Sequence, residues 1–145
     1  MTRHLLDVNV LVALLDTEHL HHEAANDWFF DHAAEGWASC PLTQNGAIRI
    51  LGNPGYPESP GLPPVIAEVV GKLCARDDHE FWPDSISLLD PAHFDRDKLP
   101  GYKHLTDTYL LALARSHGGR LVTFDRRLSV AAVAQGARHV EVIGN

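Results

Sequence analysis

The chain has 145 residues, of which 45% are apolar, so we expect one compact domain over residues 1–145 and not a disordered chain. No apolar run is long enough to span a bilayer, which argues against a membrane-spanning protein. A net charge of −7 argues against tight nonspecific binding of nucleic acid, but it does not exclude a nuclease, because divalent cations in an acidic pocket change the local sign.

The first half of the chain alternates between strand and helix patterns. A short apolar run that closes with Asp7 predicts a buried strand, and Asn9 is expected to cap the helix that follows. Gly36 is expected to end the second helix. The predicted elements are a strand over residues 4–8, helices over 10–15 and 18–35, a strand over 37–40 and a helix over 42–51.

The second half continues the alternation. The turn-rich segment from Gly52 to Pro64 predicts a loop, and the run from His104 to His117 predicts a helix that ends at Gly118. The other predicted elements are a helix over 65–75, a short strand at 81–82, a strand or irregular connection over 86–89, and strands over 120–124 and 139–143. This order favours an α/β domain with a mostly parallel sheet and helices on both faces.

Three aspartates stand where this fold would bring them together. Asp7 and Asp125 directly follow the apolar runs of HLLDVN and LVTFDRR, at the sheet edge where ligands bind. Asp107 lies in the first turn of HLTDTYLLALARSHGG, where the helix dipole favours a carboxylate. Converging carboxylates repel one another without a cation, and Mg²⁺ or Mn²⁺ prefers oxygen ligands. The set therefore points to metal-assisted phosphodiester hydrolysis.

Other interpretations of these residues stay open. An aspartate after a strand is often a helix cap or a turn residue, and on spacing alone this explanation is as good as a metal site. The histidines at 19, 21 and 22 would suggest a transition metal, but no complete tetrahedral set accompanies them, which favours a solvated helix start. Cys40 and Cys74 lie in apolar contexts typical of reduced cysteines, and no secretory signal is apparent, so we expect a cytoplasmic protein.

The chain contains four informative segments, which are LLDVNVLVALLD, HLHHEAANDWF, CPLTQNGAIRILGNP and LTDTYLLALARSHGGRLVTFDRRL. In this order they resemble the PIN-domain family, and most closely the VapC-type toxin ribonucleases of bacterial toxin–antitoxin pairs. The resemblance covers nearly the whole chain. It implies a three-layer α/β/α sandwich around a mostly parallel, five-stranded sheet. It also implies a Mg²⁺- or Mn²⁺-dependent endoribonuclease that acts on RNA, is inhibited by a small antitoxin and commonly forms a homodimer.

The resemblance assigns roles to individual residues of this sequence. The acidic metal ligands fall on Asp7, Asp107 and Asp125, and we expect one metal ion on the first two, with the third bound directly or through water. Asn9 and Thr123 fall at supporting polar positions, the first two residues after Asp7 and the second near the last acid.

Gln44 departs from the family pattern, because many PIN domains carry a glutamate there. A glutamine keeps a carbonyl oxygen but loses the charge, so it can orient a water or coordinate weakly and cannot act as a general base. Since the three aspartates are kept, we expect an active fold with a modified fourth ligand at Gln44. Arg49, which follows on the same helix, is expected to meet an RNA phosphate, an acidic antitoxin segment or a structural ion-pair partner.

Two other functions compete with the ribonuclease. The first is a catalytically weakened PIN-like module that binds RNA or a protein partner, which Gln44 and the acidic balance favour, whereas the three aspartates favour the enzyme. The second is an aspartyl-phosphate phosphotransferase. This ranks lower because DVNVL has no second aspartate two residues after Asp7 and no phosphate-binding loop accompanies it.

Overall fold

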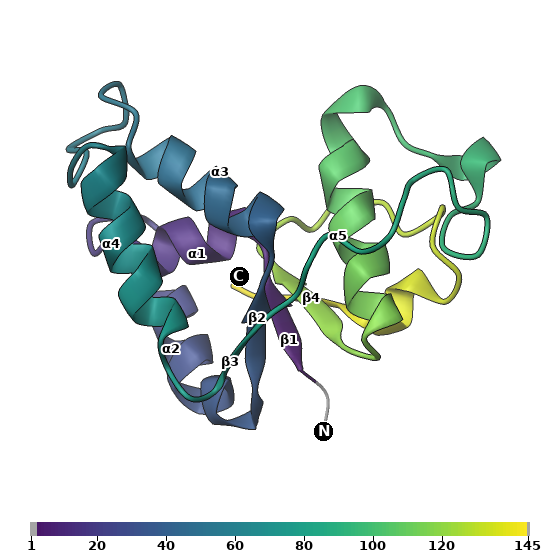
Figure 1. Ribbon diagram of the computed structural model, residues 1–145, viewed down its shortest axis with the longest axis horizontal. Coiled ribbons are helices and arrows are strands. Elements are labelled where there is room, and N and C mark those ends of the chain that lie inside the picture. Colours follow the sequence, from purple (N-terminus) through teal and green to yellow (C-terminus); the bar gives the residue numbers. More distant parts are fainter. Residues whose placement is uncertain (1–2, 145) are drawn as a thin grey trace.

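Five short parallel strands form the central sheet within residues 3–144, which are the residues that the computed structural model describes (Figure 1). The order across the sheet is β3-β2-β1-β4-β5, and each adjacent pair is parallel, so the carboxyl ends of all strands meet at one edge. This confirms the predicted five-stranded sheet. The strands are β1 (His4–Leu6), β2 (Trp37–Ser39), β3 (His79–Phe81), β4 (Arg120–Thr123) and β5 (Val140–Val142).

Helices cover both faces of the sheet, which confirms the α/β/α layers (Figure 1). Helices α1 to α4 lie on one face and α5 lies on the other. No helix within residues 3–144 has the length and apolar character needed to cross a membrane. The helices are α1 (Val8–Leu15), α2 (His22–His32), α3 (Pro41–Leu51), α4 (Pro63–Cys74) and α5 (Leu105–Ser116), with short 3₁₀ turns at Ala33–Glu35, Arg96–Lys98, Tyr102–His104 and Gly136–His139.

The central strands are buried on both faces, because successive side chains of a strand point to opposite sides of the sheet. Leu6 and Val122 belong to the core beneath helices α1 to α4. Their chain neighbours Leu5 and Leu121 belong to the core beneath α5. All four side chains are fully buried, which explains why these strands read as unbroken apolar runs in the sequence.

The start of α1 differs from the prediction. Asp7, and not Asn9, caps this helix, since the Asp7 carboxylate accepts a hydrogen bond of 2.7 Å from the backbone N–H of Val8. Aspartate and asparagine both favour the capping position, so the sequence offered two candidates two residues apart. Because Asp7 ends the strand and also begins the helix, its side chain is fixed at the carboxyl edge of the sheet.

Several other boundaries also shift. Helix α2 begins at His22 and not at residue 18. Helix α4 begins at Pro63, within the segment predicted as a loop, because proline is well tolerated in the first helical turn. Strand β3 is His79–Phe81, slightly earlier than expected, and residues 86–89 contain no strand.

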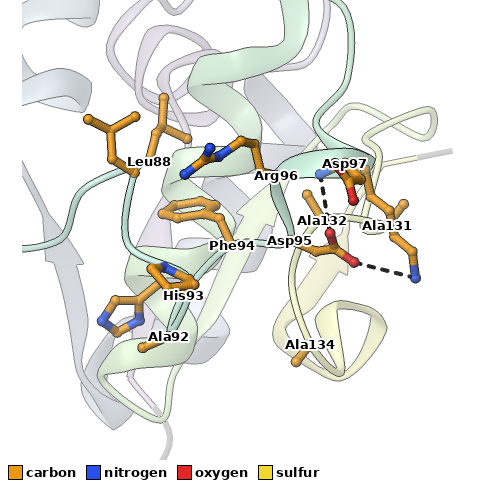
Figure 2. A pocket seen from close by; sticks show the side chains of 13 residues that line it. Leu88, Ala92, His93, Phe94, Asp95, Arg96, Asp97, Ala131, Ala132 and Ala134 are labelled. Atoms are coloured by element: carbon orange, nitrogen blue, oxygen red, sulfur yellow. Dashed lines mark hydrogen bonds and ion pairs between the residues drawn. The ribbon is translucent and has the colours of Figure 1, made fainter.

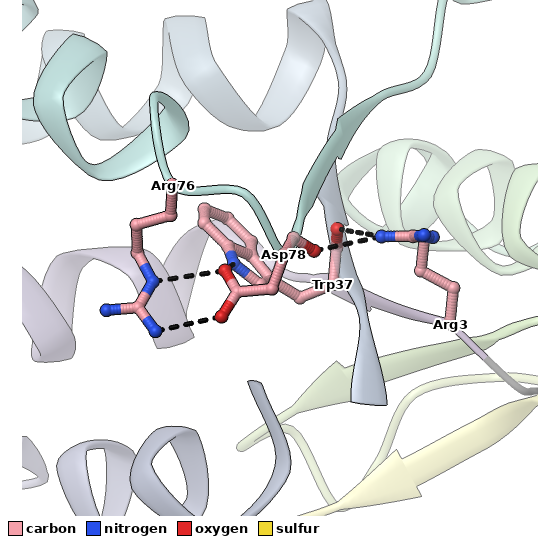
Figure 3. A network of polar contacts seen from close by, with 4 residues as sticks. All are labelled: Arg3, Trp37, Arg76 and Asp78. Carbon is pink, nitrogen blue, oxygen red and sulfur yellow. Dashed lines mark hydrogen bonds and ion pairs between the residues drawn. The ribbon is translucent and has the colours of Figure 1, made fainter. Parts of the chain in front are cut away.

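A polar network fixes the opposite, amino edge of the sheet (Figure 3). The fully buried Trp37 donates its indole N–H to the carboxylate of Asp78 at 2.8 Å, and Arg76 pairs with the same carboxylate at 2.8 Å. Arg3 donates to the backbone carbonyl oxygens of Trp37 and Asp78, at 3.2 and 2.9 Å. The network therefore joins the starts of β1, β2 and β3, and leaves the carboxyl edge free for the aspartates.

Candidate functional site

The topology brings the three predicted aspartates to one edge of the sheet. Asp7 directly follows β1, and Asp125 lies two residues beyond the end of β4, which is the neighbour of β1. Helix α5 leads into β4 and therefore runs antiparallel to it, so the start of the helix lies at the carboxyl edge. Asp107, in the first turn of α5, meets the other two aspartates there.

Asp7 is the most buried of the three, with a side chain that is only 5% exposed. Burial, together with the carboxylates of Asp107 and Asp125, raises its pKa to about 6, while hydrogen bonds from Thr123 and Val8 act in the opposite direction. The charged form of Asp7 therefore costs free energy in the absence of a cation.

Thr123 holds this part of the site together. Its buried hydroxyl donates to Asp7 at 2.8 Å and accepts from the Asn9 amide at 3.2 Å and from the backbone N–H of Asp125 at 3.1 Å. The Asn9 carbonyl accepts in turn from the backbone N–H of Phe124 at 3.3 Å. The structure thus brings both supporting residues predicted from the sequence, Asn9 and Thr123, into contact with the segments that carry Asp7 and Asp125.

Asp107 is half-buried, and one neighbour of it was not singled out in the sequence. Burial raises the pKa of Asp107, the charge of Asp125 raises it further, and His104 lowers it. His104, Asp107 and Asp125 each offer one ligand atom, and these atoms all lie within 4.8 Å of one another. This donor set fits a divalent metal ion. In the sequence, only the position of His104, three residues before Asp107, could have indicated that it belongs to the site.

A cavity of about 380 Å³ opens at this edge of the sheet. Asp7 and Asp107 line it together with Asn9, His19 and Tyr56. The two aspartates therefore face a space that a solvent-borne ion or a phosphate group can enter.

Gln44 is not among the residues that the structure brings together at this cavity. Its amide donates to the hydroxyl of Ser39 at 2.9 Å and approaches the sulfur of Cys74 at 3.9 Å. Gly46 is the α3 residue that faces the start of α1, since a Cβ atom there would lie 2.6 Å from a methyl carbon of Val8. Two residues turn a helix by roughly 200°, which places Gln44 on nearly the opposite side of α3. In this structure the Gln44 side chain therefore points away from the cavity, and a ligand role for Gln44 stays a prediction.

Arg49 is exposed on α3 and lines a second cavity together with Gln44. It forms no ion pair with another residue in the described part of the chain. Contact with an RNA phosphate or with an acidic partner segment stays a prediction for this residue.

A larger cavity, of about 680 Å³, lies between residues 88–98 and the segment around Ala132 (Figure 2). None of the residues predicted from the sequence lines it. Its Asp95 accepts from the backbone N–H of Asp97 at 3.2 Å and lies 3.8 Å from the Lys98 ammonium, so this carboxylate is already partnered. The acidic edge is the better candidate site, although the cavity there is smaller.

The family model described as the PIN domain matches residues 4–134, a range that includes Asp7, Asp107 and Asp125. The chain belongs to the PIN-domain family. Its PIN domain is 45% identical to Ribonuclease VapC44 of Mycobacterium tuberculosis over 131 residues, which are 90% of this chain and 92% of that protein. It is 41% identical to Ribonuclease VapC38 of Mycobacterium tuberculosis strain H37Rv over 140 residues, which are 96% of each chain.

Solved structures confirm the PIN fold at lower sequence identity. The sarcin-ricin loop cleaving toxin VapC20 of Mycobacterium tuberculosis superposes with a TM-score of 0.65 at 13% identity, over 97% of this chain and 99% of that one. VapBC2 from Rickettsia felis, bound to a DNA fragment from their promoter, superposes with a TM-score of 0.64 at 11% identity. The superposition covers 99% of this chain and 100% of that one. At these identities the likeness establishes the fold alone.

Proposed function

We propose that this PIN-domain protein is an endoribonuclease toxin that cleaves RNA phosphodiester bonds where Asp7, Asp107 and Asp125 converge. The observation that carries the proposal is the convergence of three carboxylates beyond the strand ends, two of which, Asp7 and Asp107, line a cavity. The relatives VapC44 and VapC38 bear the name ribonuclease, and the structural neighbour VapC20 is described as a toxin that cleaves the sarcin-ricin loop, which supports the same activity here.

We propose a divalent cation, Mg²⁺ or Mn²⁺, as the cofactor, with Asp7, Asp107 and Asp125 as the residues that would hold it. When bound, such an ion polarises a phosphoryl oxygen and stabilises the charge that develops in the transition state. Burial and two neighbouring carboxylates raise the pKa of Asp7, and a cation would relieve both costs of keeping it charged.

The protein's own residues keep the carboxylates in place. Thr123 donates to Asp7 and so favours its ionised, acceptor form. Asn9 orients the Thr123 hydroxyl and the backbone that leads to Asp125. Gln44 has no part in proton transfer in this proposal, because it lies on the other side of α3 and hydrogen-bonds Ser39.

We also propose a small antitoxin as the cognate partner. A cationic side chain of that partner would suit the acidic cavity, because the fork of an arginine binds a carboxylate through two hydrogen bonds. The structural neighbour VapBC2 supports such a pair. The free thiols of Cys40 and Cys74 are compatible with a reducing cytoplasm, and a homodimer stays a prediction of the family resemblance.

Inducible expression followed by sequencing of RNA ends tests this function. The parent, Asp107→Asn and the exposed control Asp97→Asn should be compared at equal protein levels. New RNA ends and growth arrest are expected with the parent and with Asp97→Asn, and neither is expected with Asp107→Asn. If Asp107→Asn produced new RNA ends as often as the parent, Asp107 would not be needed for cleavage. If none of the three proteins produced new RNA ends, a catalytically silent binding module would be favoured.

A further inference from the structure

His104 stands beside the acidic cluster without a structural role of its own at the helix start. It ends the 3₁₀ turn Tyr102–His104, which runs directly into α5, and its side chain is exposed. The imidazole occupies the N-cap position of α5 but makes no capping hydrogen bond. Residues three apart in such turns lie on the same side, so His104 and Asp107 face the same way.

The separation of the donor atoms suits one shared ion. A ligand nitrogen of His104 and carboxylate oxygens of Asp107 and Asp125 lie within 4.8 Å of one another. Around an octahedral ion with bonds of roughly 2.1 Å, ligand atoms stand about 3.0 Å apart when adjacent and about 4.2 Å apart when opposite. The upper bound of 4.8 Å exceeds the separation of opposite ligands by only about 0.6 Å, and the exposed His104 side chain has room to move toward a shared ion.

We propose that His104 supplies a nitrogen ligand to the divalent ion, and that this ligand makes the site select a transition-metal ion such as Mn²⁺ over Mg²⁺. The inference rests on the metal-dependent function proposed above. Mg²⁺ takes oxygen ligands almost exclusively, whereas imidazole nitrogen binds the first-row transition metals more readily. The fourth protein donor, expected from α3 at Gln44, thus comes from the start of α5.

His19 provides a matched control, because it lines the cavity of Asp7 and Asp107 but has its own partner. The Nδ1 atom of His19 accepts a hydrogen bond of 3.0 Å from the backbone N–H of His21. Its replacement removes an imidazole from the same cavity without touching the group formed by His104, Asp107 and Asp125.

Metal binding to the untagged protein tests the proposal independently of RNA cleavage. Mn²⁺ binding can be followed by the electron paramagnetic resonance signal of the free ion, and Mg²⁺ binding by competition. His104→Ala should weaken Mn²⁺ binding about tenfold or more while changing Mg²⁺ binding less than about twofold. His19→Ala should leave both unchanged, and Asp107→Asn should weaken both. Because His104 is exposed and makes no cap, circular dichroism should show an unchanged fold.

Pulsed electron paramagnetic resonance of bound Mn²⁺ reports the ligand directly. Coupling to a nitrogen nucleus is expected in the parent and in His19→Ala, and is expected to vanish in His104→Ala. Coupling that survives in His104→Ala, or an unchanged ratio of Mn²⁺ to Mg²⁺ affinity, would overturn the proposal. A parent that binds Mn²⁺ through oxygen alone would overturn it and leave the proposed function standing, whereas a parent that binds neither ion would overturn both.

Discussion

The hydroxyl of Thr123 donates a hydrogen bond of 2.8 Å to the carboxylate of Asp7, which lies 116 residues earlier in the sequence. The same oxygen accepts from the Asn9 amide and from the backbone N–H of Asp125. One fully buried hydroxyl therefore connects the residues at the ends of β1 and β4. The hydrogen bond also lowers the pKa of Asp7 against the effect of burial, so Thr123 favours the charged form that would bind a cation.

Replacing Thr123 by valine should therefore destabilise the protein. The substitution nearly keeps the shape but removes the donor to Asp7 and the acceptor for Asn9 and Asp125, and buried groups left without partners cost about 1–3 kcal/mol of unfolding free energy. The loss should be larger above pH 6, where the folded protein must hold a charged Asp7. Urea unfolding at pH 5 and pH 8 measures both effects.

The control is Thr123→Ser, which keeps the hydroxyl and loses only a methyl group. Its loss of stability should be smaller and should not grow between pH 5 and pH 8. Equal and pH-independent losses for the valine and serine variants would mean that the hydroxyl does not support Asp7.

The pH dependence of stability in chelator should reveal Asp7 itself. Burial raises its pKa to about 6 in the folded protein, above roughly 3.9 in the unfolded chain. Between these values the folded state holds a proton that the unfolded state has lost, so this group's stabilising contribution is present below about pH 4 and is lost as pH rises through 6. Relative to the parent, Asp7→Asn should gain roughly 2.4 kcal/mol of unfolding free energy from pH 4 to pH 8.

The matched comparison is Asp97→Asn, an exposed carboxylate outside the site. Any hydrogen-bond mismatch of the new amide with Thr123 adds a pH-independent cost and does not change the slope. If the curves of Asp7→Asn and the parent ran parallel from pH 4 to pH 8, the raised pKa of the buried Asp7 carboxyl would be disproved.

The strand ends could be predicted because buried parallel strands leave an unbroken apolar run in the sequence. Leu5 and Leu6 face opposite cores, so both must be apolar, and the first carboxylate after them, Asp7, has to lie at the sheet edge. The same logic located Asp125, and the helix pattern located Asp107. These three positions follow from local patterns together with the handedness and order of the fold.

The rest of the site depends on which way each helix is turned, and this cannot be read from one strand or helix alone. Gln44 and Gly46 lie in the same helix, and only the packing of Gly46 against Val8 decides which of them faces α1. His104 was missed for a related reason. A single histidine before a helix carries no periodic signal, and its closeness to Asp125 arises only when α5 lies beside β4.

Substitutions at Gln44 test the orientation of α3. Because its amide bonds to Ser39, both Gln44→Glu and Gln44→Ala should leave the Mn²⁺ concentration for half-maximal RNA cleavage unchanged within about twofold, although each can alter stability by about 1 kcal/mol. Titrations of Mn²⁺ against cleavage rate for the three proteins measure this. A clear fall in the Mn²⁺ requirement of the glutamate variant would show that position 44 reaches the metal after all.

Cleavage of RNA by the purified protein, with Mn²⁺ and with chelator, tests the central claim most directly. The parent should cut in Mn²⁺ and stop in chelator. Asp7→Asn should lose at least about a hundredfold in rate while keeping its fold, because it removes a negative charge that would hold the cation. Undiminished cleavage by Asp7→Asn in the presence of chelator would contradict a metal-dependent mechanism at these aspartates.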